Sequence, residues 1–191
     1  EMKRDDEIAI LVDSINDMTA KMKDYINNLS TVTTEKERIS TELDLAKNIQ
    51  EGMLPSIFPT FSSWKEFDLY TTMDTAKEVG GDYYDFYKLD ENHIAVTIAD
   101  VSGKGLPAAL FMVIAKTVLK NIAIGAASAY ANGSEPDFAA VVAQANRQLC
   151  ENNKETMFVT QFFGVLDIRT GVFCYVNGGH NTPLVGRKSA D

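Results

Sequence analysis

The strongest constraint on the fold comes from residues 79–110, which read as two strands, a tight turn, a glycine-rich corner and a helix start. Residues 83–89 are rich in aromatic side chains and residues 94–99 in β-branched and apolar ones, which favours paired strands. Asp90, Glu91 and Asn92 supply the turn between them. Asn92 is expected to adopt the left-handed conformation in which three-residue hairpin loops often end. The stretch therefore predicts an antiparallel hairpin.

The length of this turn decides which residues face each other. If Leu89 faces His93, Asp82 lies directly across from Asp100, with Cβ atoms about 4.5–5.5 Å apart. Two carboxylates at that distance repel each other unless something positive lies between them, and no Lys or Arg of the hairpin is placed there. Mg²⁺ and Mn²⁺ prefer hard oxygen ligands, so a divalent cation is the natural answer. A turn one residue shorter or longer would move the partner of Asp82 to a neighbour of Asp100.

Residues 8–53 show a second pattern, in which apolar residues recur at alternating steps of three and four, interrupted by Lys36 and Gln50. A repeat sustained over this length predicts a left-handed coiled coil of about 70 Å. The Ser- and Thr-rich residues 30–34 have weak helix propensity and favour a local break. Pro55 is expected to end the helix. We interpret residues 8–53 as a homodimerisation rod that can also carry a signal.

The composition narrows the class of protein. A chain of 191 residues with 45% hydrophobic residues can form one good-sized domain plus an extension. A formal net charge of -9 argues against nucleic-acid binding through a basic surface and suits a cytoplasmic protein. The apolar residues 106–131 contain Lys116 and Lys120, so we expect no membrane span there. Cys150 and Cys174 are interpreted as reduced, buried thiols.

The remaining patterns alternate between strands and helices. Residues 67–73 read as a first strand, and residues 158–168 and 171–177 as a later hairpin. Pro107 suits the first turn of a buried helix that ends at Ile124, a small-residue loop follows at 125–133, and a second helix covers 137–150. Strands, a helix pair and strands in this order predict an α+β fold, in a layered α/β/β/α plan of antiparallel sheets.

Four motifs in order resemble the RsbU/SpoIIE-type branch of the metal-dependent PPM serine/threonine phosphatases. They are Gln-Glu-Gly-Met-Leu-Pro at 50–55, Val-Gly-Gly-Asp-Tyr-Tyr-Asp at 79–85, Ile-Ala-Asp-Val-Ser-Gly-Lys-Gly-Leu-Pro-Ala-Ala-Leu at 98–110 and Tyr-Val-Asn-Gly-Gly-His-Asn-Thr-Pro at 175–183. The resemblance implies that residues 55–191 are the N-terminal part of a PPM-type domain whose C-terminal strands are missing. It also implies that the helices at 106–124 and 136–150 act as a switch.

The resemblance implies a chemistry as well. Two Mn²⁺ or Mg²⁺ ions would hold a water that attacks a phosphoserine or phosphothreonine. Asp82 and Asp100 would bind these ions, and so would the backbone carbonyl of Val101. The substrate would be a phosphorylated protein such as an anti-sigma-factor antagonist. In the family, a later Thr-Asp-Gly motif supplies a further acidic metal ligand, and this chain stops at Asp191 before any such motif. We therefore expect this chain to bind metal weakly and to have little activity.

The N-terminal part carries a second resemblance. Residues 4–30 are similar to the second helix of a HAMP linker domain, so residues 1–30 are interpreted as a partial HAMP and residues 31–54 as a coiled-coil linker helix. This implies the cytosolic side of a membrane-anchored sensor, with membrane contact only through segments missing from this chain.

Several residues have a plainer interpretation beside the functional one. Asp85 and Asp90 are expected to be solvated. The sequence indicates no interaction partner for His93, which lies beside the turn. His180 is expected to form hydrogen bonds within its loop. Lys104 could contact phosphate near the helix start, but a surface lysine is the simpler interpretation.

Two rival functions remain. A Gly-Gly-Asp-Glu-Phe-type nucleotide cyclase would need a second acidic pair upstream, which residues 70–77 do not supply. A non-catalytic coiled-coil module that binds a partner is the alternative from another class.

Overall fold

A computed structural model describes residues 7–55, 65–73, 79–151 and 153–187 of the chain. The secondary-structure elements are α1 (Glu7–Met53), β1 (Tyr83–Lys88), β2 (His93–Val101), α2 (Leu106–Ala126), α3 (Ser128–Ala131), α4 (Phe138–Cys150), β3 (Val159–Asp167) and β4 (Phe173–Gly178). Contacts divide the chain into residues 1–45 and residues 46–191, which we describe separately.

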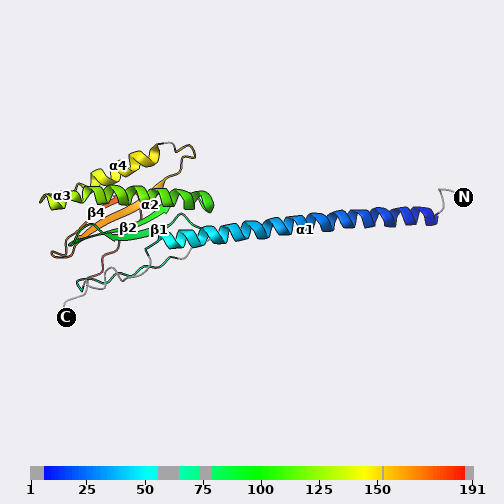
Figure 1. Cartoon of the computed structure of the whole chain (residues 1–191), viewed down its shortest axis with the longest axis horizontal. Coiled ribbons are helices and arrows are strands. Elements are labelled where there is room, and N and C mark those ends of the chain that lie inside the picture. The colour runs from blue at the N-terminus through cyan, green and yellow to red at the C-terminus, as the bar shows by residue number, and fades with distance from the viewer. Residues whose placement is uncertain (1–6, 56–64, 74–78, 152, 188–191) are drawn as a thin grey trace. The chain divides into compact units, whose positions relative to one another are not determined.

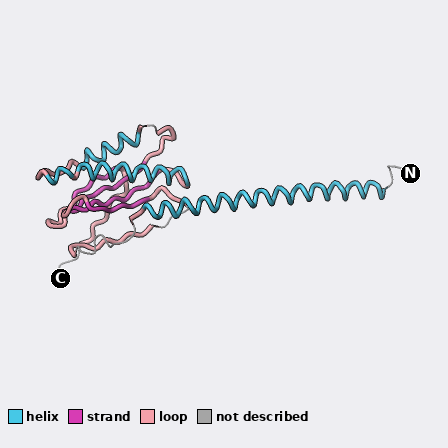
Figure 2. The backbone as a smooth tube through the Cα atoms, in the orientation of Figure 1, coloured by secondary structure: helices cyan, strands magenta, loops and turns pink. Residues whose placement is uncertain are grey.

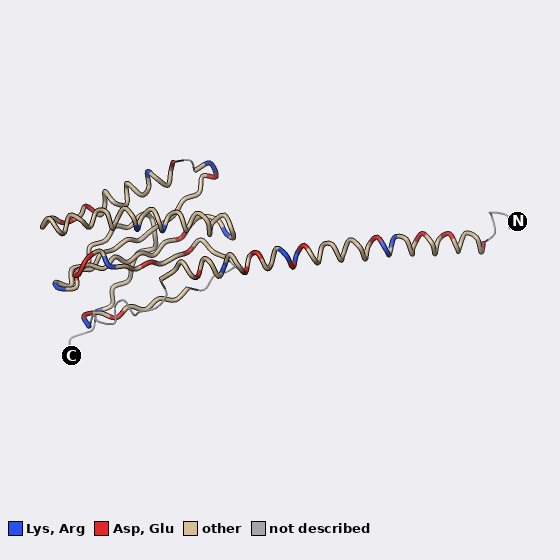
Figure 3. Tube along the Cα trace, viewed as in Figure 1, with Lys and Arg blue, Asp and Glu red and all other residues tan. Residues whose placement is uncertain are grey.

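Helix α1 confirms the long predicted helix and its end before Pro55. The expected break at residues 30–34 was wrong, because the helix continues through them. The hydroxyls of Thr31 and Thr34 donate to backbone carbonyls one turn back, at 3.0 Å each, so these polar side chains are satisfied within the helix. Charged residues recur along α1 (Figure 3), and the apolar seam residues are exposed, with Leu11 at 59% and Ile15 at 53%. Dimerisation through this seam remains a prediction.

The unit formed by residues 46–191 is built on one four-stranded antiparallel sheet in the order β1-β2-β3-β4. Helices α2, α3 and α4 connect β2 to β3 and form a layer on one face of this sheet (Figures 1 and 2). The predicted strands at 83–89, 94–99, 158–168 and 171–177 are confirmed to within two residues at each end. Pro107 lies in the first turn of α2, as expected.

Two apolar clusters join the helices to the sheet. In one, Met112 and Ala115 of α2 pack with Tyr83 and Ala99. In the other, Leu119 of α2 packs with residues of β2, β3 and α4. Alanines on the inner side of α2 allow the helix to approach the strands closely. The stretch Leu106–Ala131 is, within the described ranges, long and apolar enough to cross a membrane, a test that buried core helices also pass.

The two lysines of α2 have a partner on the sheet. Lys116 Nζ lies 2.9 Å from the Asp85 carboxylate, and Lys120 Nζ lies 3.7 Å from it. Asp85 is only 2% exposed, so the expectation that it is solvated was wrong. Side chains of a strand alternate between its faces, and Asp85 therefore points to the same helix-covered side as Tyr83 and Tyr87.

The opposite face of the sheet is covered only in part by the described residues. The expected strand at residues 67–73 was wrong: the segment does not pair with the sheet. Phe67 and Leu69 pack instead on Phe86 and Ile94. Other apolar side chains of this face are exposed, including Tyr175 at 56%. The α+β class with an antiparallel sheet is confirmed. One helical layer and one sheet of the expected four layers lie within the described residues.

Three smaller expectations also need correction. The predicted loop at 125–133 is largely helical, because alanine-rich sequence extends α2 to Ala126 and forms α3. Cys150 and Cys174 are free thiols but exposed, since one ends α4 and the other lies on the edge strand β4. Asn92 does not have a positive φ.

Candidate metal centre

The register of the β1–β2 hairpin brings two acidic residues together. Tyr83 pairs with Ala99, and the Leu89 amide donates to the His93 carbonyl at 2.9 Å, which confirms the predicted register. Asp82, directly before β1, therefore lies opposite Asp100, near the end of β2. The Asp90 carboxylate fixes the turn, because it accepts hydrogen bonds from the amide of Asn92 at 2.7 Å and from the amide of His93, the first residue of β2, at 2.9 Å.

The two carboxylates affect each other. Partial burial, followed by repulsion from Asp100 and a hydrogen bond to it, raises the pKa of Asp82, while His180 acts in the opposite direction. Both acidic residues line a cavity of about 310 Å³ beside the glycine-rich loop and a cavity of about 610 Å³ on the open face of the sheet. The pair thus lies where two solvent-accessible cavities meet.

Gly81 explains how the chain reaches this position beside β2. A Cβ atom on Gly81 would lie 2.8 Å from the carbonyl oxygen of Val101 and 3.0 Å from its Cβ. Only glycine permits this approach without a shift of the backbone. The carbonyl of Val101, predicted as a metal ligand, is therefore held against the loop that carries Asp82.

Gln50, near the C-terminus of α1, is a site residue that the sequence analysis missed. Its side-chain amide forms two hydrogen bonds with the backbone of Gly80, one to the carbonyl at 2.6 Å and one from the amide at 3.1 Å. Gln50 is 5% exposed. The signal was present as an interruption of the heptad, because a polar residue at a seam position needs a partner elsewhere.

The glycine-rich motif at the end of β4 positions His180 near the acidic pair. The side chain of Asn177 accepts from the His180 amide at 2.8 Å and donates to its carbonyl at 3.0 Å. His180 Nδ1 lies 3.0 Å from the Thr160 hydroxyl, which in turn donates to the Asp100 carbonyl at 3.4 Å. The expectation that His180 forms hydrogen bonds within its loop is confirmed, and His180 also lines the larger acidic cavity.

The oxygen atoms available at this site are of the type that binds a hard divalent cation. Carboxylate and carbonyl oxygens are the ligands that Mg²⁺ and Mn²⁺ prefer, and a bound cation would offset the repulsion between Asp82 and Asp100. No cluster of three or more His, Cys, Asp or Glu side chains suited to a metal occurs in the described part of the chain. These residues therefore account for part of a coordination shell.

His93 has a partner after all, at the other end of the hairpin. Its Nδ1 lies 2.8 and 2.9 Å from the two oxygens of Asp90, and its ring stacks on Tyr130 with centroids 3.7 Å apart. Burial acts to raise the pKa of Asp90, but hydrogen bonds from Asn92 and His93 outweigh it and lower that pKa. This contact ties the turn to α3.

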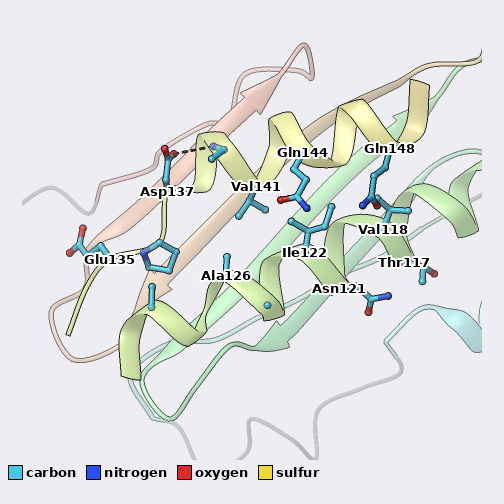
Figure 4. Close-up of a pocket in the computed structure, with 14 residues that line it drawn as sticks. Thr117, Val118, Asn121, Ile122, Ala126, Glu135, Asp137, Val141, Gln144 and Gln148 are labelled. Atoms are coloured by element: carbon cyan, nitrogen blue, oxygen red, sulfur yellow. Dashed lines mark hydrogen bonds between the residues drawn. The ribbon is translucent and has the colours of Figure 1, made fainter. Parts of the chain in front are cut away.

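A larger cavity lies away from the acidic pair, between α2 and α4. It measures about 680 Å³ and its lining includes Asn121, Gln144 and Gln148 (Figure 4). Its charged lining residues are Glu135 and Asp137, and the Asp137 side chain already caps α4 by accepting from the Ala140 amide at 3.0 Å. Among the described residues that line this cavity there is no Lys or Arg to bind a phosphate group.

The fold of residues 46–191 identifies the structural class of the protein. Residues 46–191 contain a helix-covered antiparallel sheet with acidic residues at the strand ends, and the fold is that of PP2C-type phosphatase domains. The solved SiaA-PP2C domain of Pseudomonas aeruginosa matches with a TM-score of 0.51 at 23% identity, over 72% of this chain and 51% of that one.

The chain belongs to the SpoIIE family, because the model of that family, Stage II sporulation protein E, matches residues 90–191. Protein IcfG of Synechocystis is 29% identical over 95% of this chain, and phosphoserine phosphatase RsbU of Bacillus subtilis is 31% identical over 76% of it. The chain spans 30% of the length of IcfG and 39% of the length of RsbU.

Proposed function

We propose that this chain contains the metal-binding part of a protein serine/threonine phosphatase that hydrolyses phosphoserine or phosphothreonine on a regulatory protein. The observation that carries the proposal is the Asp82–Asp100 pair, which lies in register across the hairpin and lines two open cavities. Membership of the SpoIIE family and similarity to a named phosphoserine phosphatase support this function. No observation favours the non-catalytic alternative.

Asp82, Asp100 and the carbonyl of Val101 would hold Mn²⁺ or Mg²⁺ at this site. Such an ion supplies Lewis acidity and lowers the pKa of water for attack on phosphorus. The residues of the chain would keep the ion's ligands in place: Gly81 through its approach to Val101, and Gln50 through its hydrogen bonds to the same loop. Bringing both reactants to one fixed position lowers the entropic cost of the reaction.

The substrate and assembly are also proposals. An anti-sigma-factor antagonist is the substrate that the family resemblance favours, in a cytoplasmic setting. Residues 8–53 would form a parallel or antiparallel homodimer, a proposal supported by the exposed seam of α1. A partial HAMP at 1–30 followed by a linker at 31–54 would join this output to a sensor.

The proposal is tested by hydrolysis of a phosphoserine peptide with excess Mn²⁺. We expect a low rate of phosphate release, in keeping with the weak metal binding that the sequence predicts, and this release should depend on the metal and be lost in Asp100→Asn. A matched control is Glu91→Gln, since Glu91 is exposed in the turn of the same hairpin. Metal-independent turnover, or full activity of Asp100→Asn, would refute the proposed function.

A further inference from the structure

The loop between β2 and α2 holds a lysine in a defined place. Gly103 and Gly105 have φ values of 91° and 74°, a region that side-chain-bearing residues rarely adopt. Lys104 lies between these two glycines. The start of the loop is fixed to the residue before β3, because the Ser102 amide donates to the Phe158 carbonyl at 2.8 Å and the Phe158 amide donates to the Ser102 hydroxyl at 2.9 Å.

Lys104 shares a cavity with the acidic pair. It lines the 310 Å³ cavity together with Asp82 and Asp100. Neither this cavity nor the adjoining 610 Å³ cavity has another Lys or Arg among its lining residues in the described part of the chain. Lys104 is exposed and forms no ion pair with another described residue, so its ammonium group is available to a ligand.

The charges of this cavity pose a problem for a phosphate monoester. The substrate is a dianion near neutral pH, and two carboxylates facing it would repel it. A metal ion offsets the carboxylates, but the oxygens of the phosphoryl group that point away from the metal still need a positive partner. Lysine serves as such a partner as a point charge on a flexible stem. The N-terminus of α2, which follows the same loop, contributes charge of the same sign.

We propose that Lys104 binds the phosphoryl group of the substrate. This inference rests on the proposed function and adds a substrate contact to it. Asp82 and Asp100 serve the cation on one side of the cavity, while Lys104 serves the non-bridging phosphate oxygens from the glycine-rich loop. The Gly-Lys-Gly sequence would then have two roles. It turns the chain into α2, and its two glycines position the backbone of Lys104 so that the ammonium group lies at the cavity.

The test measures ligand binding without turnover. Inorganic phosphate and free phosphoserine are titrated by calorimetry into the full chain loaded with Mn²⁺, for the wild type, Lys104→Met, Lys104→Arg and Lys154→Met. Lys154 is an exposed lysine in the loop between α4 and β3, and its side chain lines neither cavity. Its variant therefore controls for the change in net charge. Titration with Mn²⁺ alone checks that each variant keeps its metal affinity.

We expect Lys104→Met to weaken binding of both ligands by about tenfold, as for loss of a hydrogen bond to a charged group, with Mn²⁺ affinity unchanged. Lys104→Arg should retain most of the binding, and Lys154→Met all of it. Equal phosphate affinity of Lys104→Met and the wild type would overturn this inference alone. A wild-type chain that binds Mn²⁺ but no phosphate would also overturn it, whereas failure to bind Mn²⁺ would overturn the proposed function and this inference together.

Discussion

Replacement of Asp82 by Asn should stabilise the metal-free protein. Asp82 and Asp100 face each other about 5 Å apart, where two unit charges repel by about 0.8 kcal/mol in water and about 3 kcal/mol at an effective dielectric constant near 20. Both residues are exposed, so we expect a gain near the lower limit, about 1 kcal/mol. For a folded unit of this size, that gain corresponds to an increase in Tm of about 2–4 °C.

The effect should depend on pH in a defined direction. The folded-state pKa of Asp82 is raised from its ordinary value of 3.8, so ionisation of this group opposes folding. The metal-free wild type therefore loses stability as the pH rises through the folded pKa of Asp82. The advantage of Asp82→Asn should be full above the folded-state pKa of Asp82 and should shrink as the pH falls towards 3.8.

Thermal unfolding in EDTA, followed by circular dichroism at several pH values, measures this difference. Glu91→Gln removes an exposed acid from the same hairpin and should leave Tm nearly unchanged. Adding Mn²⁺ should reverse the order, because the ion binds the wild type more tightly and therefore stabilises it more than Asp82→Asn. The reasoning is refuted if Asp82→Asn has a lower Tm than the wild type in EDTA at pH 7, or if Mn²⁺ raises both Tm values equally.

Three further substitutions test the contacts around the site by urea denaturation. Gln50→Ala should destabilise residues 46–191 by about 1–3 kcal/mol because two backbone groups of the loop before β1 lose their partner, and an unchanged midpoint would contradict this. Lys116→Met should cost about 1–3 kcal/mol because the buried carboxylate of Asp85 loses its nearer cation and keeps only Lys120, at 3.7 Å, and adding Asp85→Asn should recover most of the loss. Gly81→Ala should cost about 1–3 kcal/mol through overlap with β2, whereas Gly125→Ala, in the open, should add about 0.5–1 kcal/mol; equal effects of the two would argue against the close approach.

The sequence predicted the acidic pair because hairpin register is local. The length of the turn and the alternation of side chains are enough to place Asp82 opposite Asp100. The register was right although the conformation expected at Asn92 was wrong, since the Asp90 side chain fixes the turn in another way. Different local conformations can thus produce the same pairing.

The sequence could not predict contacts that depend on packing between distant elements. Asp85 reads as a solvated acid on the predicted strand at 83–89, and only the position of α2 over the sheet brings Lys116 to it. Gln50 reads as a defect in a heptad, and its partner Gly80 lies 30 residues away. The expected strand at 67–73 failed for a related reason, because a loosely alternating segment becomes a strand only when a partner strand lies beside it.

The most direct test of the account is Mn²⁺ binding, followed by electron paramagnetic resonance of the free ion and by calorimetry. We predict that the wild type and Glu91→Gln bind Mn²⁺, and that Asp82→Asn and Asp100→Asn each bind it at least about tenfold more weakly because a charged ligand is lost. Unchanged Mn²⁺ affinity in both aspartate variants would contradict the claim that this facing pair holds the metal.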